Sequence, residues 1–366
     1  MEKTDNMDQV LAGVCAKFQI RGSYQGYDQI KVGNINQTYC VRYLGEDGTP
    51  KKYIVQRVNT FVFKNPENVM HNIDYVTEHI RRKKKDGVAL HFHHTADRKT
   101  YVNEKDGFWR IMNFVPALSP SEIPSKEEVY YAGGAFGEFQ MQLGDFDASL
   151  LYTTIPDFHN TKKRMEKLFA DEKEDSCGRA AEVRDLLSYL HEAAPLACRL
   201  TEMQEEGTLP VRVTHNDTKI NNVLFDPETK KGLVVIDLDT VMPGLVGHDF
   251  GDAIRFACNT QEEDSEHTEL VALDLDLFEA FAKGFLEQTK ETLTKEEIDT
   301  LGLSAFVMTV ELAARFLDDY ILGDEYFKIN YPTHNLVRTR CQIALAKDME
   351  RKMDEMNAII ARCAQA

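Results

Sequence analysis

The 366-residue sequence lacks the features that mark secreted, membrane-spanning and nucleic-acid-binding proteins. Basic residues are scarce, 43 against 60 Asp and Glu, and the formal charge of -17 argues against nucleic acid as a partner. No run approaches the roughly eighteen apolar residues that can span a membrane, and the N-terminus lacks the apolar core of a signal peptide. The seven cysteines form no C-x-x-C pair and are odd in number, which indicates reduced thiols. These absences predict a soluble cytoplasmic protein with no nucleic-acid or membrane partner.

Length and composition indicate a chain that folds throughout. The chain of 366 residues is too long for one simple core and suits two lobes or domains. Hydrophobic residues make up 43% of it, and no low-complexity tract interrupts the sequence. We therefore expect two folded lobes.

The segment 211–254 concentrates the polar residues that could carry chemistry. Two short apolar runs rich in β-branched residues, 211–213 and 233–236, predict strands, and each leads into a polar segment. The polar residues after the two runs are His215, Asp217, Asn222, Asp237 and Asp239. A carboxylate near a nucleophile, with an amide and a second carboxylate able to hold a hard cation, suits phosphoryl transfer with Mg²⁺.

Each of these residues also has an ordinary explanation. Asp and Asn favour loops because their side chains form local hydrogen bonds there. Considered alone, each residue could be either a loop cap or a catalytic residue. Their order and their position after two strands favour the catalytic interpretation.

The spacing of these residues resembles that of a known enzyme superfamily. The pattern H-x-D-x-x-x-x-N, followed by an apolar run ending in Asp, occurs in protein kinases and in the aminoglycoside and choline kinases. The sequence here reads HNDTKINN and IDLD, which resembles the small-molecule branch more than the protein-kinase H-R-D-L and D-F-G. The segments HNDTKINNVLFD, VIDLDTVMPG and HDFGDAIR are similar to the N-acetylhexosamine 1-kinases.

The resemblance implies an α+β, two-lobed, protein-kinase-like fold. Residues 1–114 would form a nucleotide-binding lobe with a mostly antiparallel sheet and one or two helices. Residues 115–366 would form a helical lobe for catalysis and substrate binding, with ATP and Mg²⁺ held between the two. By the same resemblance Asp217 accepts or orients the proton of the acceptor hydroxyl and His215 braces the loop. Asn222 and Asp237 would bind Mg²⁺, and Asp239 would contact metal or acceptor.

The first lobe should contain short strands at 29–32, 38–43 and 53–58. The connection between the first two contains Gly33, Asn34 and Asn36, and in a kinase-like lobe it covers the nucleotide phosphates with backbone N–H groups. An ordinary hairpin turn would use the same residue types.

The third strand departs from the protein-kinase pattern because it has no Lys. It offers Gln56 and Arg57, of which only one can face the nucleotide because neighbouring side chains alternate between faces. Charge favours Arg57. A helix over 65–85 should supply the acid that pairs with this cation, either Glu67 or Glu78.

Helices dominate the rest of the prediction. Ser125 and Glu128 form a capping-box pattern, as do Thr294 and Glu297. Apolar periodicity predicts helices over 5–18, 125–143, 182–201, 270–289, 294–320 and 336–362.

The acceptor site is predicted from two further segments. The segment around Arg315 and Tyr326 is similar to one that lines the sugar site in the N-acetylhexosamine kinases. Arg315 could instead pair on the helix surface with Asp318 or Asp319. The segment 155–161 also resembles that group, so that its Asp157 and His159 could touch substrate or cap a loop. Asp249, by contrast, is expected to fix the catalytic loop through backbone bonds.

The resulting expectation is a kinase of N-acetylglucosamine or N-acetylgalactosamine that makes the sugar 1-phosphate. Another small hydroxyl compound, such as an amino alcohol, an aminoglycoside or a different sugar, is the alternative acceptor. A nucleotide-binding regulator without catalysis is the alternative of another class. The missing strand Lys favours that regulator, whereas the presence of Asp217, Asn222 and Asp237 opposes it. The sequence does not indicate an oligomeric state.

Overall fold

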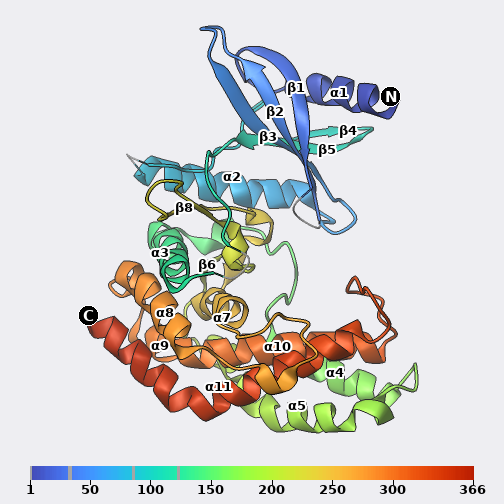
Figure 1. Cartoon of the computed structure of the whole chain (residues 1–366), viewed down its shortest axis with the longest axis vertical. Helices are drawn as coiled ribbons and strands as arrows, with labels where there is room; N and C mark the ends of the chain where they lie inside the picture. The colour runs from blue at the N-terminus through green and yellow to red at the C-terminus, as the bar shows by residue number, and fades with distance from the viewer. Residues whose placement is uncertain (1, 32–34, 85–86, 122–123) are drawn as a thin grey trace. The chain divides into compact units, whose positions relative to one another are not determined.

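The computed structural model describes residues 2–31, 35–84, 87–121 and 124–366. The chain forms two compact units. The first comprises Met1–Leu118 with the short segments Ser149–Thr154 and Ile236–Val241. The second comprises Ser119–Ala148, Ile155–Val235 and Met242–Ala366. A small antiparallel sheet in one unit and a larger helical part in the other confirm the predicted fold class (Figure 1).

The first unit is built on a five-stranded antiparallel sheet with the order β1-β2-β3-β5-β4. Its elements are α1 (Glu2–Cys15), β1 (Ser23–Ile30), β2 (Gln37–Leu44), β3 (Pro50–Val58), α2 (Pro66–Lys83), β4 (Val102–Glu104) and β5 (Gly107–Asn113). The three predicted strands are present. However, β1 begins well before residue 29, and its pairing with β2 shifts register between Tyr24 and Tyr27.

The two faces of this sheet have different surroundings. Leu11 and Val14 of α1 pack in one apolar cluster with Tyr39, Val55 and Trp109 of the sheet. Because side chains alternate along a strand, the neighbours of these strand residues point to the opposite face. Gln56 and Arg110 lie next to each other on that face.

The second unit is mainly helical. Its helices are α3 (Lys126–Gln142), α4 (Thr161–Glu174), α5 (Arg184–Ala197), α6 (Arg199–Glu205), α7 (Val246–Ala257), α8 (Leu275–Thr289), α9 (Lys295–Asp299), α10 (Leu301–Ile321) and α11 (His334–Gln365). Four short strands, β6 (Arg212–Thr214), β7 (Val223–Phe225), β8 (Gly232–Val235) and β9 (Met242–Gly244), pair as β6 with β9 and β7 with β8. Among the helices in the described residues, none is long and apolar enough to cross a membrane.

Both predicted capping boxes are present, but two predicted helices are interrupted. Ser125 and Glu128 cap α3, and Thr294 and Glu297 cap α9. The helix predicted over 294–320 is divided into α9 and α10 at Thr300, whose hydroxyl donates to the last carbonyls of α9. The helix predicted over 182–201 is likewise divided into α5 and α6. Helix α4 was not predicted.

Close contact between α3 and α8 depends on glycine. A Cβ atom added at Gly284 would lie 2.1 Å from the carbonyl oxygen of Tyr130, whereas one added at Gly134 would meet nothing closer than 3.8 Å. We therefore expect Gly284→Ala to lower the free energy of unfolding by about 1–3 kcal/mol through overpacking. Gly134→Ala is the matched control, and it should be neutral or stabilising because alanine favours helices by about 1 kcal/mol. Urea unfolding measures both, and equal midpoints for the two variants would contradict this packing.

Candidate active site: the loop after β6 and the segment after β8

The predicted catalytic residues lie on the loop after β6, the first of the two predicted strands, and this loop leads into β7, which was not predicted. β6 ends at Thr214, and a short turn of 3₁₀ helix, Ile220–Asn222, leads into β7. Asn216 adopts a left-handed conformation with φ of 65°. Asn tolerates this conformation better than most residues, and such backbone strain persists only where surrounding contacts enforce it.

Asp249 of α7 supplies some of those contacts. Its Oδ2 accepts from the backbone N–H of His215 at 2.8 Å, and its Oδ1 accepts from that of Asn216 at 2.7 Å. Gln140 donates to Oδ2 at 2.7 Å. Burial raises the pKa of Asp249 although these hydrogen bonds oppose the shift. The prediction that Asp249 fixes the loop through backbone bonds is confirmed.

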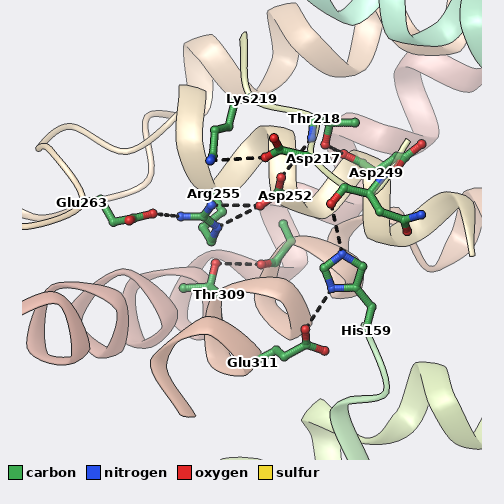
Figure 2. Close-up of polar contacts among 12 residues, drawn as sticks. His159, Asp217, Thr218, Lys219, Asp249, Asp252, Arg255, Glu263, Thr309 and Glu311 are labelled. Atoms are coloured by element: carbon green, nitrogen blue, oxygen red, sulfur yellow. Dashed lines mark hydrogen bonds and ion pairs between the residues drawn. The ribbon is translucent and has the colours of Figure 1, made fainter. Parts of the chain in front are cut away.

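Asp252, one turn further along α7, holds the next part of the loop (Figure 2). It accepts from the backbone N–H of Thr218 at 3.1 Å and from Arg255 at 2.8 Å. Burial alone would raise the pKa of Asp252, but the charges of Arg255 and Lys219 outweigh it and hold the pKa below its usual value. Arg255 also pairs with Glu263 at 2.5 Å. The loop backbone is therefore anchored on two ionisable residues of one helix.

His215 acts on the loop from inside the protein. Its Nδ1 accepts from the backbone N–H of Asp217 at 3.3 Å, and its ring meets Phe136 and Phe139 edge to face. The residue is fully buried. This placement fits the predicted bracing role and leaves no surface for contact with a substrate.

Asp217 presents a partly accessible carboxylate, 29% exposed, at the surface of this anchored loop. The Nδ2 of Asn222 donates to the Asp217 carbonyl at 2.8 Å and to its Oδ2 at 3.2 Å. Since Nδ2 faces Asp217, the Oδ1 of Asn222 is the atom that can bind a cation. Lys219 lies 3.3 Å from Oδ1 of Asp217. Sequence reasoning missed Lys219, although its position two residues after Asp217 was a usable signal.

Asp237 lies two residues after the end of β8, close to the predicted position, and belongs to the first unit. It has a φ of 60°, an uncommon conformation for a residue other than glycine, which often marks a functional position. Asn222 belongs to the second unit, so their joint binding of Mg²⁺ stays a prediction. Within the described ranges, no group of three or more His, Cys, Asp or Glu residues is placed to hold a metal ion.

Asp239 is tied into the first unit by two side chains. One carboxylate oxygen forms an ion pair with Arg110, and the other accepts from Nδ2 of Asn36 at 2.7 Å. Both partners of the ion pair are buried. This arrangement favours a structural role for Asp239 over the predicted contact with metal or acceptor. The predicted phosphate-covering residues Gly33 and Asn34 lie outside the described residues.

The sheet register places Arg57 and Arg110 on opposite faces. Arg57 pairs in register with Trp109, and its guanidinium lies over the Trp109 ring on the face that packs with α1. Gln56 pairs with Arg110 and accepts from its Nε at 2.9 Å on the other face. Arg110 is therefore the cation beside Gln56 on that face, and the placement favours it over Arg57 as the counterpart of the missing strand Lys.

The predicted acid on α2 does not pair with either arginine. Glu78 forms an ion pair with Arg81 at 2.5 Å, and Glu67 hydrogen-bonds to Tyr101. The expectation that one of these two acids neutralises the strand cation is wrong. Arg110 receives its counter-charge from the segment after β8, which a pattern confined to one helix cannot reveal.

Arg315 projects from α10 into an aromatic environment. Its guanidinium lies 5.4 Å from the centre of the Phe158 ring and 5.6 Å from that of Phe327. Arg315 pairs with neither Asp318 nor Asp319, the two carboxylates of the alternative prediction. Asp318 pairs with Lys167 at 2.5 Å.

Asp319 holds the segment after α10. Its two oxygens accept from the backbone N–H groups of Tyr326 at 2.7 Å and Phe327 at 2.9 Å, and Asn335 donates to it at 2.8 Å. The Tyr326 side chain remains 72% exposed. Arg315 and Tyr326 are thus on adjoining segments, as the predicted acceptor site requires.

The segment 157–159 connects this region to the catalytic loop. His159 contacts Glu311 of α10 through Nδ1 at 2.9 Å and the carbonyl oxygen of Asn216 through Nε2 at 3.3 Å. Asp157 pairs with Lys163 at 2.8 Å. Both side chains predicted as possible substrate contacts are thus engaged within the protein. Arg315 lies over the ring of Phe158, and the next residue, His159, contacts the loop that carries Asp217.

Comparison with known proteins agrees with this arrangement. Residues 27–286, more than half of the chain, match the phosphotransferase enzyme family, APH. The chain belongs to this family. The predicted relationship to aminoglycoside and choline kinase-like phosphotransferases is therefore confirmed for the family as a whole.

Solved structures similar to this phosphotransferase share its fold at low sequence identity. An aminoglycoside phosphotransferase from Alicyclobacillus acidocaldarius is 14% identical, with a TM-score of 0.64 and 96% of each chain covered. A microcompartment-associated aminopropanol kinase is 16% identical, with a TM-score of 0.59 over 95% of this chain and 98% of the other. Spectinomycin phosphotransferase, solved with ADP and spectinomycin, is 12% identical, with a TM-score of 0.55 over 94% of this chain and 98% of the other.

Proposed function

We propose that this phosphotransferase is an ATP-dependent kinase that phosphorylates the anomeric hydroxyl of an N-acetylhexosamine. The observation that carries the proposal is the anchored loop that presents the Asp217 carboxylate beside Lys219. Arg315 lies over the ring of Phe158, whose neighbour His159 contacts this loop. Phosphoryl transfer needs positioned groups and charge neutralisation more than covalent chemistry by the protein. A rigid loop with one accessible carboxylate and one adjacent ammonium group supplies both.

The roles of the loop residues follow from their contacts. Asp217 would accept or orient the proton of the acceptor hydroxyl, and Lys219 would neutralise charge on the transferred phosphoryl group. ATP as the donor is supported by the family and by the ADP found in spectinomycin phosphotransferase. Asn222 Oδ1 and the Asp237 carboxylate are hard oxygen donors that suit Mg²⁺, which would neutralise the phosphate oxygens when bound.

The surroundings of Arg315 support a neutral sugar as acceptor. A guanidinium fork donates hydrogen bonds to hydroxyl or amide oxygens, and it repels a polycationic antibiotic. The formal charge of -17 attracts cations to the surface, but salt screens this attraction beyond roughly 8 Å at physiological ionic strength. The local positive charge of Arg315 should therefore decide the choice of acceptor.

An amino alcohol is the second candidate acceptor. The excess of acidic residues and the structural likeness to an aminopropanol kinase favour it. A small amino alcohol carries a single positive charge, so it would need an acidic partner in the acceptor site. Arg315 opposes such a ligand, and for this reason we rank the amino alcohol below the sugar.

An ADP-release assay over a panel of acceptors tests the proposal. The panel should contain N-acetylglucosamine, N-acetylgalactosamine, other sugars, aminopropanol, choline and several aminoglycosides. We expect turnover of the N-acetylhexosamines, with the product identified as the sugar 1-phosphate by ³¹P NMR. Equal or better turnover of an aminoglycoside or an amino alcohol would overturn the sugar assignment. ATP binding without turnover of any acceptor would favour a nucleotide-binding regulator.

Substitution of Arg315 gives a sharper prediction. Arg315→Ala should raise the KM for the sugar by at least about 10-fold, because one lost charge-assisted hydrogen bond is worth about 1.5–3 kcal/mol, while the KM for ATP stays nearly constant. Arg340→Ala is the matched control, since Arg340 is an exposed arginine of α11. Steady-state kinetics of both variants measure the effect. An unchanged sugar KM in Arg315→Ala would assign Arg315 to the surface.

A further inference from the structure

The peptide bond between Asn216 and Asp217 is held at both ends by imidazole rings. On one side the Asp217 N–H donates to Nδ1 of His215 at 3.3 Å. On the other side the Asn216 carbonyl lies 3.3 Å from Nε2 of His159. Rotation of this peptide plane would redirect the carboxylate of Asp217. The two rings therefore restrain the residue that the proposed function makes the base.

The contacts of His159 define its chemical state. Its two neighbours are a carboxylate oxygen of Glu311 and a backbone carbonyl oxygen, and both are hydrogen-bond acceptors. For both contacts to be hydrogen bonds, both ring nitrogens must donate, which only the doubly protonated imidazolium can do. The Nδ1 contact, at 2.9 Å, is also the pairing expected of an imidazolium with a carboxylate.

Glu311 is built to hold such an ion. Its side chain is 1% exposed, and its second oxygen accepts from the hydroxyl of Thr161 at 2.7 Å. Burial alone would raise the pKa of Glu311, but the contact with His159, together with Arg315 and His248, outweighs burial and lowers this pKa to about 2. An ionised Glu311 with both oxygens occupied keeps His159 in one orientation.

The pair of His159 and Glu311 also connects the loop that carries Asp217 to helix α10 (Figure 2). Glu311 and Arg315 are four residues apart on α10 and so lie on the same side of the helix. Phe158, next to His159, packs against the Arg315 guanidinium. The helix of the predicted acceptor site thus contacts the catalytic loop through His159, whereas Asp249 and Asp252 anchor the same loop from α7.

We propose that His159 is a positioning residue, which as an imidazolium held by Glu311 fixes the Asn216 carbonyl and thereby the direction of the Asp217 carboxylate. This inference rests on the proposed function, since it assigns Asp217 as the base. His159 makes no contact with the reacting atoms. Its contribution is the orientation of the peptide that precedes them.

Three variants test the role in the whole protein, with the acceptor that gives the highest turnover in the panel. His159→Leu removes the donor and should lower kcat roughly 10- to 100-fold, the size of a small misplacement of a catalytic group, while the KM for ATP stays within about 2-fold. His159→Gln keeps one N–H donor and should recover most of this loss. His334→Gln is the control, because His334 is also buried and contacts a carboxylate, Asp264 at 2.9 Å, while its other ring nitrogen accepts from the backbone N–H of Asn330 and not from the loop.

The control should lose thermal stability without losing kcat. Equal kcat in His159→Leu and wild type would overturn the proposal. So would a folded His159→Gln enzyme as slow as His159→Leu, since the donated bond would then be irrelevant.

The state of His159 is measured independently of any acceptor. In protein labelled with ¹⁵N-histidine, the ring signals that disappear in His159→Gln belong to His159, and both nitrogens should be protonated. An unprotonated ring nitrogen would overturn the proposal. If the wild type transferred phosphate to no acceptor, the proposed function would fail, and this measurement would still decide the state of His159.

Discussion

Asp217→Asn should lower kcat about 10²- to 10⁴-fold, because a positioned general base usually contributes a factor of this size. The amide has the shape of the carboxylate, so the hydrogen bond from Asn222 and the anchored backbone of the loop can remain. Only the charge and the proton-accepting oxygen are lost. ATP should bind the variant almost as well as the wild type, which calorimetry can measure.

The matched control is Asp226→Asn. Asp226 lies just after β7, outside the anchored loop, and its carboxylate accepts from the backbone of its own turn at Glu228 and Thr229. Its substitution should leave kcat unchanged. If Asp217→Asn kept more than about a tenth of wild-type kcat with saturating substrates, Asp217 would not be the base.

Removal of divalent metal should abolish phosphoryl transfer entirely. The predicted ligands are an amide oxygen of Asn222 and the carboxylate of Asp237, which suit a hard cation whose octahedral coordination is completed by water and phosphate oxygens. Activity should vanish in EDTA and return with Mg²⁺ or Mn²⁺. Neither ligand type is the sulfur or imidazole that a structural zinc site uses.

Variants of the two ligands sharpen this test. Asn222→Ala and Asp237→Ala should both raise the Mg²⁺ concentration needed for half-maximal activity, whereas the Asp226→Asn control should not. Titration of activity against Mg²⁺ gives these values. Turnover in excess EDTA, or zinc retained by the purified protein, would contradict the assignment.

The candidate catalytic loop, residues 215–222, could be predicted from sequence because its determinants are local. Two apolar runs predict β6 and β8, and the spacing from His215 to Asn222 fixes which side chains share the loop. The sequence also predicted that Asp249 would bind the backbone of this loop. The short turn at 220–222 and the left-handed Asn216 adjust the geometry without changing the order of the residues.

The cation of the sheet could not be predicted in the same way. The choice between Gln56 and Arg57 depends on which face of β3 points away from α1, and the sequence gives alternation without direction. Arg110 lies opposite Gln56 only because β5 pairs with β3 in one register. The partner of Arg110, Asp239, is 129 residues away in sequence.

The contact between His159 and Glu311 was missed for a related reason. Its two residues are separated by 152 positions, and each has a common local explanation. The helix break at Thr300 was missed because a capping box marks where a helix starts and carries no information about its length. Patterns within one element were reliable, whereas pairings between distant elements required the structure.

The ion pair between Arg110 and Asp239 also has a consequence for synthesis of the chain. A ribosome adds about 5–20 residues per second, so roughly 6–26 s separate the translation of these two residues, which are 129 positions apart. During this interval the nascent sheet holds an arginine without its counter-charge, and an uncompensated buried charge is costly. The first 118 residues should therefore stay incompletely packed on the ribosome until the segment Ile236–Val241 has emerged. A chain that stops before this segment would be a target for chaperones and proteases rather than an independent domain.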